Sequence, residues 1–548
     1  MASNSPKFMG LAGRPLSLAV STVATTGFLL FGYDQGVMSG IITAHPFNDV
    51  FEATRDNSTM QGTVTAIYEI GCLFGAMFIL AVGDLLGRRR AIILGALIML
   101  AGVIIQVTSM VGSTPLAQFI VGRVVMGAGN GINTSTIPTY QAECSKTSNR
   151  GLLICIEGGV IAFGTLIAYW IDYGASFGPD DLTWRFPIAF QVIFALIIII
   201  PMIFLPESPR WLLSHGRVEE ADKVISALRG YELTSENTAL ERNLIIDSLR
   251  ASGGYGQKST PVKFLFTNGK TQHFRRMMLG ASSQLMQQIG GLTRNMSLLI
   301  GGVNMIVYAI FATFSWFFIE RIGRRRLFLY GTVGQMVAMI IAFACLIPDD
   351  NQVAKGAVVG FFIYIASFGA TWLPLPWLYP AEVNPIKTRA KANAVSTCTN
   401  WLFNFLVVMV VPIMVTNIGW GTYLFFAACN ACFLPVIYFF YPETARRSLE
   451  EIDIIFAKGY AERISYVKAA EELPHLQPSE IEGYAQRYGL IDTTSRTSAG
   501  RNSRDEEKIL ESRTDGNASG SNEAIVNEHG VESGLGGGVN TSGRADRG

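Results

Sequence analysis

The chain has 548 residues, of which 49% are hydrophobic and 16% charged, and its formal net charge is +1. This composition is far from that of a soluble globular protein. The net charge by itself says nothing about nucleic acid, but the lysines and arginines sit in short loops rather than along one face, so we expect no nucleic-acid partner. The five histidines and seven cysteines form no metal-ligand or catalytic constellation. We therefore expect a membrane protein that uses no metal, no cofactor and no enzymatic chemistry.

Apolar runs of about 20 residues recur along the sequence, and each can cross the hydrocarbon core of a bilayer as a helix. The first run follows Lys7 and Arg14 directly and is too long for the apolar region of a cleaved signal peptide. The sequence predicts twelve transmembrane helices, the seventh of them short, at 16–39, 62–82, 91–111, 116–138, 152–173, 186–205, 277–291, 296–319, 327–347, 358–379, 394–415 and 423–440.

Arginine clusters predict the orientation, because positive charge accumulates in cytoplasmic loops. "GRRR" stands at 87–90, between the second and third spans, and again at 323–326, between the eighth and ninth. Both termini and the segment 207–276 are then cytoplasmic. Asn57, in the sequence "NST", falls in the first external loop and is a candidate for glycosylation.

An internal repeat divides the spans into two sets of six. "GRRR" recurs 236 residues later, and "PES" at 206–208 returns as "PET" at 442–444 with the same offset. The pattern Tyr-x-Ala-Glu with a following arginine occurs at 140–150 and again at 379–389. Three motifs in one order at nearly one spacing indicate two related six-helix halves.

The halves are joined by a charged segment whose apolar residues recur at helical spacing, which predicts short amphipathic helices. After residue 458 the composition lacks the apolar residues needed for a core. The predicted organisation is a cytoplasmic N-terminus (1–15), a first half (16–206), a cytoplasmic linker (207–276), a second half (277–442), a post-bundle helix (443–458) and a mostly disordered cytoplasmic tail (459–548).

Ten motifs, among them "GYDQGVMSG", "GRVVMGAGNG", "PESPRWL", "QQIGG" and "PETARRSLEE", follow one another between about residues 20 and 455. In this order they resemble the sugar porter family of the major facilitator superfamily, and the fungal hexose and polyol transporters in particular. The resemblance implies an all-α major facilitator fold with a substrate site at mid-membrane between the halves. It also implies a plasma-membrane protein that carries a monosaccharide or polyol with a proton by alternating access.

Asp34 is the only acidic residue in the first span, and a carboxylate buried in a bilayer is costly enough to be a functional candidate. Arg123 in the fourth span is its natural partner. The alternative is a static bridge between packed helices. The resemblance favours proton coupling, because proton-coupled sugar porters carry an acid at this position.

Acids and arginines at the cytoplasmic ends of the helices are candidates for a gate that breaks when that side opens. Positive-inside topology alone is the alternative, but topology requires only the cations. The gate candidates are Asp84, Arg88, Glu143 and Arg150 in the first half and Glu320, Arg324, Glu382 and Arg389 in the second.

A sugar site needs amides for adjacent hydroxyl groups and an aromatic face for the ring. Such amides also serve as contacts between helices. The resemblance assigns substrate binding to the paired glutamines of the seventh helix, the asparagine of the eighth, the tryptophan of the tenth and an Asn-Trp pair in the eleventh: Gln287, Gln288, Asn304, Trp377, Asn400 and Trp401.

The sequence departs from the family pattern in three helices. Gly158, preceded by Glu157, stands where the fifth helix usually has a glutamine, and Leu373 replaces a glycine in the tenth. In the seventh helix "LTRN" follows "QQIGG" at once, so the usual asparagine and tyrosine pair are missing. Either two crossings are cramped into residues 277–319, with Arg294 reaching the outer surface, or the gene model or splice form lacks part of this helix.

Two other functions share the predicted fold. One is a carrier of another small solute, such as quinate, a disaccharide or a pathway metabolite, which the altered fifth helix suits as much as it suits a hexose. The other is a transporter-like sugar sensor that signals through its tail, although the tail is short and has no motif for that role.

Overall fold

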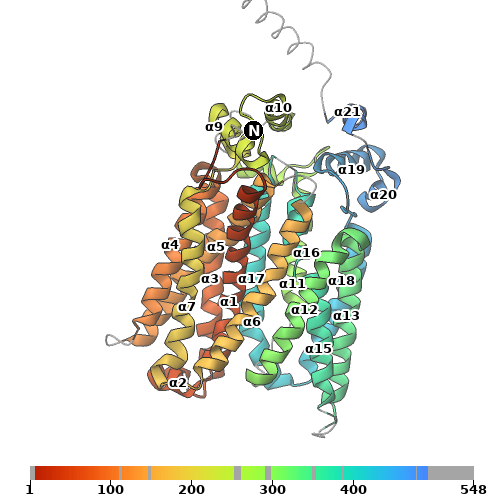
Figure 1. The fold of residues 1–548 in the computed structure, drawn as a ribbon. Helices are drawn as coiled ribbons and strands as arrows, with labels where there is room; N and C mark the ends of the chain where they lie inside the picture. Colours follow the sequence, from red (N-terminus) through yellow and green to blue (C-terminus); the bar gives the residue numbers. More distant parts are fainter. Residues whose placement is uncertain are drawn as a thin grey trace, which may run out of the picture. The chain divides into compact units, whose positions relative to one another are not determined.

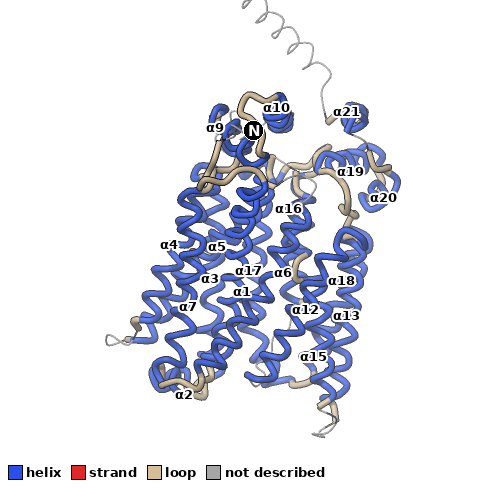
Figure 2. The backbone as a smooth tube through the Cα atoms, in the orientation of Figure 1, coloured by secondary structure: helices blue, strands red, loops and turns tan. Residues whose placement is uncertain are grey.

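A computed structural model describes residues 6–109, 114–145, 150–251, 261–290, 298–348, 353, 355–385, 387–476 and 478–490. The chain divides into two units, Met1–Ile491 and Asp492–Gly548, and all described residues belong to the first. The described part is helical throughout, apart from its loops and one isolated bridge between Phe8 and Leu11 (Figure 2). This confirms the all-α fold class. The tail beyond residue 490 lies outside the described residues.

The first half consists of six long helices that match the first six predicted spans (Figure 1). The short helix α2 (His45–Val50) and the turn η1 (Glu52–Thr54) connect the first two of them. The six are α1 (Arg14–Ile41), α3 (Ser58–Leu86), α4 (Arg88–Val107), α5 (Pro115–Cys144), α6 (Arg150–Ala175) and α7 (Asp180–Phe204).

The second half contains α11 (His273–Ile289), α12 (Leu298–Ile322), α13 (Arg324–Leu346), α15 (Gly356–Ser367), α16 (Leu375–Val383), α17 (Arg389–Ile418) and α18 (Gly421–Phe440). The tenth predicted span is interrupted. Between α15 and α16 lies a π-helical turn, η3 (Phe368–Trp372), and Pro374 follows it. Proline has no N–H for the helical ladder, so the break has a local cause in the sequence.

Ten described helices, with α15 to α16 counted as one, are long and apolar enough to cross a membrane. The other two helices at predicted spans are α5 and α11. α5 carries Arg123, Asn130 and Asn133 in its buried part and packs against α1, α3 and α4. α11 has only 17 residues, which at about 1.5 Å each fall short of the roughly 30 Å of hydrocarbon. It ends at Ile289, and residues 291–297, including Arg294, lie outside the described residues.

Glycines let the helices of the first half approach closely. Gly32, Gly36 and Gly40 are spaced four residues apart on α1 and face α6. A Cβ atom on Gly32 would lie 2.0 Å from the carbonyl oxygen of Ile161. Because lipid gives helices no hydrophobic drive to associate, such small-residue faces supply the packing instead.

Short helices cover one end of the bundle, which we call the linker end (Figure 1). The N-terminal segment joins them, since Gly13 donates a backbone hydrogen bond to Ala227 at 2.6 Å. The sequence analysis placed the start of the tail at 459, whereas the structure continues α19 to Glu462 and adds two further helices. The six helices are α8 (Pro209–Ser214), α9 (Val218–Arg229), α10 (Glu236–Ala251), α19 (Leu449–Glu462), α20 (Tyr466–Glu472) and α21 (Pro478–Arg487).

An ion pair ties α19 to the bundle. Arg276 of α11 is fully buried and pairs with Asp453 of α19 at 2.6 Å. Its guanidinium also lies 4.6 Å from the ring centre of Phe456 and donates to the carbonyl oxygen of Val383. A buried arginine without such partners would carry a large desolvation cost.

We expect Gly32→Ala to destabilise the protein, because the new methyl group collides with the α6 backbone. Overpacking of this kind costs about 1–3 kcal/mol. The purified protein is heated to a series of temperatures, and size-exclusion chromatography measures the fraction that remains monodisperse. The melting temperature obtained in this way should be lower for Gly32→Ala. The matched control is Gly174→Ala, where no atom lies within 4 Å of the added Cβ. Equal melting temperatures for the two variants would contradict the close-packing argument.

Candidate functional site

A cavity of about 320 Å³ lies between the two halves. Its wall combines α1, α3, α5 and α6 of the first half with α11, α12, the α15–α16 segment and α17 of the second. This volume falls within the roughly 300–1,000 Å³ range of small-molecule sites. The cavity therefore has the position and size that a solute site between two halves requires.

The cavity extends toward the end of the bundle that carries α2. Its lining on α1 runs from Phe31 to Ile42, and on α17 it runs from Asn404 to Pro412, in both cases toward that end. On α3 the lining begins at Gln61, close to the helix start, and stops at Glu69. The opposite, linker-end portion of these helices does not line it.

Aromatic side chains from both halves close the inner end of the cavity. Trp377 of α16 makes edge contacts with Phe28 and Phe31 of α1, with ring centres 5.2 and 5.7 Å apart. Trp401 of α17 packs against Phe31 at 5.1 Å and Tyr68 at 6.2 Å. These contacts bury large apolar surfaces across the seam between the halves.

Asp34 and Arg123 both line the cavity and are almost fully buried. Tyr68 stands between them: its hydroxyl donates to Asp34 Oδ2 at 3.0 Å, and the Arg123 guanidinium lies 4.7 Å from its ring centre. Arg123 Nη2 donates to the carbonyl oxygen of Thr65 at 3.0 Å. The predicted pair is thus linked through Tyr68 rather than by a direct ion pair in this conformation.

Glu69 is a second acid in the same wall, and the sequence analysis did not identify it. It is 5% exposed, lines the cavity, and its Oε2 has no hydrogen-bond partner within the protein. The signal was present as an acidic residue inside the second apolar span. The criterion applied to Asp34 selects Glu69 equally.

Gln287 and Gln288 reach the cavity from the last turn of α11. Gln287 Nε2 donates to the carbonyl oxygens of Trp372 and Leu373 at 2.9 and 3.2 Å, two acceptors exposed by the break before α16. Its Oε1 has no partner within the protein. Gln288 Nε2 donates to Asn400 Oδ1, which places Asn400 directly behind the wall.

The remaining predicted binding residues are also close to the cavity. Trp377 lines it, and Trp401 lies behind Phe31. Asn304 is buried, precedes the lining residue Met305, and has an unpartnered Oδ1.

Gly158 brings the backbones of α6 and the second half together. A Cβ atom there would lie 2.8 Å from Cα of Pro374. Glu157 is buried, and neither of its carboxylate oxygens has a hydrogen-bond partner. Where the family pattern has a glutamine side chain, the backbone of α6 therefore packs closely against Pro374.

A cluster of charges closes the linker end of the first half. Arg88 pairs with Glu143 at 3.1 Å and with Asp84 at 3.7 Å. Glu207, between α7 and α8, accepts from the backbone N–H groups of Arg88 and Arg89 at 3.0 and 3.1 Å. Burial raises the pKa of Glu207 above its usual range, although these N–H groups favour the ionised form.

The second half repeats this cluster residue for residue. Arg324 pairs with Glu382 and Glu320, both at 2.7 Å, and Glu443 accepts from its backbone N–H at 2.7 Å. Gly87 and Gly323 both adopt positive φ, 84° and 95°, which lets the chain turn beneath the carboxylates. The sequence repeat is therefore also a repeat of side-chain geometry.

Among the described residues, two close approaches join the halves at the linker end. Lys391 of α17 lies 3.8 Å from Asp84 of α3, and Gly151 at the start of α6 approaches Glu320 and Arg324. Arg389 donates to the carbonyl oxygen of Asn384. The side chain of Arg150, the other predicted gate residue, lies outside the described residues.

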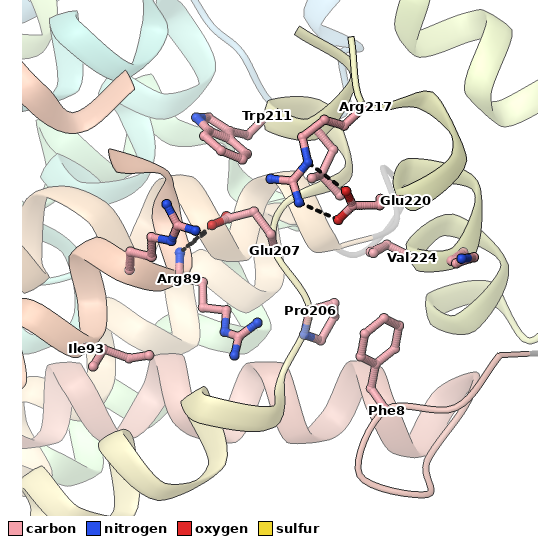
Figure 3. A pocket seen from close by; sticks show the side chains of 12 residues that line it. Phe8, Arg89, Ile93, Pro206, Glu207, Trp211, Arg217, Glu220 and Val224 are labelled. Carbon is pink, nitrogen blue, oxygen red and sulfur yellow. Dashed lines mark hydrogen bonds and ion pairs between the residues drawn. The ribbon is translucent and has the colours of Figure 1, made fainter. Parts of the chain in front are cut away.

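A second cavity, of about 590 Å³, lies at the linker end beside the first-half cluster (Figure 3). Glu207 projects between Arg89 and the Arg217–Glu220 ion pair, and Phe8 and Val224 supply apolar wall. It is distinct from the cavity between the halves and shares no lining residue with it.

Comparison with known proteins assigns the chain to a family. The family model described as "Sugar (and other) transporter" matches residues 20–456. The chain belongs to the sugar transporter family. As a member of this family it is a transporter in the membrane and not an enzyme.

Two fungal relatives of this sugar transporter span nearly the whole chain. It is 44% identical to "Sugar transporter STL1" of Saccharomyces cerevisiae over 507 residues, covering 88% of this chain and 89% of the relative. It is 42% identical to "Major facilitator superfamily transporter mfsA" of Aspergillus fumigatus, covering 88% and 93%.

Solved structures confirm the major facilitator fold. The proton:xylose symporter XylE, bound to 6-bromo-6-deoxy-D-glucose, aligns with a TM-score of 0.69 at 22% identity, covering 81% of this chain and 99% of that one. A partially occluded inward-open conformation of XylE from E. coli aligns with a TM-score of 0.65 at 22% identity, covering 79% and 100%.

The candidate glycosylation residue of the transporter is exposed. Asn57 precedes α3, and its Oδ1 accepts from the backbone N–H of Met60 at 3.0 Å, so it caps this helix. Its modification stays a prediction.

We expect Asp84→Asn to favour opening of the linker end, because Asp84 pairs with Lys391 across the halves and with Arg88 within one half. A pair of this kind contributes up to about 1 kcal/mol, so the open population should rise by up to about fivefold. Distances between spin labels on α3 and α17 at that end measure the population. The control Asp181→Asn makes the same substitution in an exposed pair with Arg185 within α7, at the opposite end of the bundle. Identical distance distributions for Asp84→Asn and wild type would contradict a gating role.

Proposed function

We propose that the protein carries a monosaccharide or a polyol across the plasma membrane together with a proton, by alternating access. The observation that carries the proposal is the cavity between the halves, whose wall combines the amide Gln288, the indole of Trp377 and the acid Asp34. Amide and indole groups suit hydroxyl groups and the apolar face of a sugar. The buried acid supplies a group that can take up a proton.

The direction of the cavity supports alternating access. It extends toward the α2 end, while aromatic packing and the charge clusters close the linker end. With the termini assigned to the cytoplasm by the positive-inside rule, this is an outward-facing conformation. Return to the inward-facing conformation requires the pair Lys391–Asp84 to separate and the contact of Trp377 with α1 to open.

A second candidate substrate class follows from α6. Because Gly158 is packed against Pro374, no side chain from that position offers a hydrogen bond to a solute. This supports another small solute, such as quinate, a disaccharide or a pathway metabolite, that does not need every amide of the family pattern. A transporter-like sensor would have the same cavity but would give no net uptake.

The decisive experiment is uptake of a panel of labelled sugars, polyols and organic acids into cells that lack their own hexose carriers, with and without an uncoupler. Accumulation that the uncoupler abolishes supports symport and identifies the solute. Equilibration that the uncoupler leaves unchanged would replace symport by facilitated diffusion, and no uptake of any solute would favour the sensor.

Asp34→Asn is expected to abolish accumulation against a gradient while preserving exchange of solute. The amide oxygen still accepts from Tyr68, but the side chain no longer takes up a proton. Counterflow in proteoliposomes measures exchange, and uptake driven by an imposed pH gradient measures accumulation. Wild-type protein with an uncoupler is the control and should behave like the variant. Uphill uptake by Asp34→Asn would remove this residue from the proton pathway.

Gln288→Ala should weaken solute binding by about 1–3 kcal/mol, the usual cost of leaving a buried polar partner unpaired. This corresponds to a roughly 5- to 150-fold higher Kd, measured by equilibrium binding of the labelled solute to purified protein. Asn417→Ala, which removes an exposed amide of α17, is the matched control. Equal affinities for the two variants would place the solute elsewhere.

A further inference from the structure

We propose that Glu69 is a second proton-binding group of the cavity, which shares Arg123 with Asp34 and links the bound proton to the seam between α3 and α17. The proposal rests on the proton symport proposed above. It assigns a function to an acid that the sequence motifs do not mark.

The position of Glu69 meets the requirements of a proton site. It lies on one face of α3 with Thr65, Tyr68 and Cys72, at the spacing of successive helical turns. Thr65 accepts the Arg123 hydrogen bond, and Tyr68 donates to Asp34. One helical face therefore contacts every charged member of the site, and Glu69 lines the cavity from which a proton arrives.

The polar and titratable groups around Glu69 come from three neighbouring helices and from α3 itself. They are Asp34 of α1, Arg123 of α5 and the amide of Asn404 on α17, together with Tyr68 and Cys72 on α3. Arg123 is the single cation in this group. Two carboxylates therefore depend on one guanidinium.

One guanidinium compensates one buried carboxylate, so the other carboxyl group is favoured in its neutral, protonated form. Arg123 has the capacity to serve either acid: only Nη2 is engaged with Thr65, while Nε and Nη1 have no hydrogen-bond partner within the protein. Asp34 Oδ1 and Glu69 Oε2 are likewise unpartnered. The two acids then titrate as a coupled pair rather than independently.

Protonation of Glu69 changes the hydrogen bonds that it can form with Asn404 of the second half. A carboxylate only accepts hydrogen bonds, whereas a carboxylic acid also donates one, and the Asn404 amide can match either form by presenting its nitrogen or its oxygen. Asn404 Nδ2 forms no hydrogen bond of standard geometry in this conformation, although its amide interacts with the Glu69 carboxyl group. The proton enters from the cavity onto a carboxylate oxygen and leaves toward the opposite side, and no other bond forms or breaks. Its presence thus alters the contact across the α3–α17 seam.

The test uses the full-length protein in proteoliposomes and measures the rate of solute exchange over a range of pH. In Asp34→Asn, exchange should still depend on pH, because Glu69 still titrates. In the double variant Asp34→Asn/Glu69→Gln this dependence should be lost. The matched control is Asp34→Asn/Asp172→Asn, which removes a buried, unpartnered acid of α6 outside the cavity lining and should keep the dependence.

A double variant with Glu69→Gln that keeps the pH dependence of the control would overturn the proposal. If Glu69→Gln yields no folded protein, Asn404→Ala in the wild-type background takes its place. This variant should shift the pH profile of exchange, and an unshifted profile would also overturn the proposal. The variant Asp34→Asn/Glu69→Asp, which keeps a carboxyl group at position 69, should depend on pH as Asp34→Asn does. The proposed symport is tested separately by measuring solute-driven proton movement in the wild-type protein. If no proton movement is detected, symport is contradicted. If protons move but Glu69→Gln leaves the pH dependence of exchange unchanged, only the proposal for Glu69 is contradicted.

Discussion

Burial of arginine inside a membrane protein is the constraint on which the rest of the structure depends. A guanidinium cannot lose its charge, so each buried one must be surrounded by acceptors. Arg88 and Arg324 meet this need with acids from neighbouring helices, and these contacts fix the ends of the two halves in the same way. Arg123 meets it incompletely, with one carbonyl, an aromatic ring and two nearby acids. The arginines with a full set of partners stabilise the ends of the two halves, and Arg123, with an incomplete set, lies in the cavity where we propose that a proton and a solute bind.

Two amides around the cavity also make contacts within the second half. Gln287 donates hydrogen bonds to backbone carbonyl oxygens at the break before α16, and Gln288 donates one to the side chain of Asn400. A solute that bonds to these side chains therefore competes with contacts that shape the second half. If the proposed site is correct, a ligand that alters the Gln287 contacts also alters the interruption of the tenth span, and this would couple binding to conformational change.

The sequence predicted the helices and the repeat because apolar length and charged motifs are local signals. It could not predict the partners of the charges. Glu143 was identified as a gate candidate without a partner, and the structure pairs it with Arg88, which is distant along the chain but adjacent in space. Glu69 was overlooked although it is an acid inside an apolar span, as Asp34 is; what the sequence could not show is that both acids line one cavity. The link between Asp34 and Arg123 through Tyr68 also depends on helix rotation, which spacing alone leaves open.

The pairing of Arg276 with Asp453 has a consequence for biosynthesis. Arg276 opens the second half, but the acid that neutralises it belongs to α19, which follows the last membrane helix. During translation the second half is therefore inserted with one of its basic residues uncompensated. Its packing is completed only when α19 leaves the ribosome and folds back onto the bundle. A stop codon ahead of α19 would spare every transmembrane helix and still leave a nascent chain that quality control can recognise as unfinished.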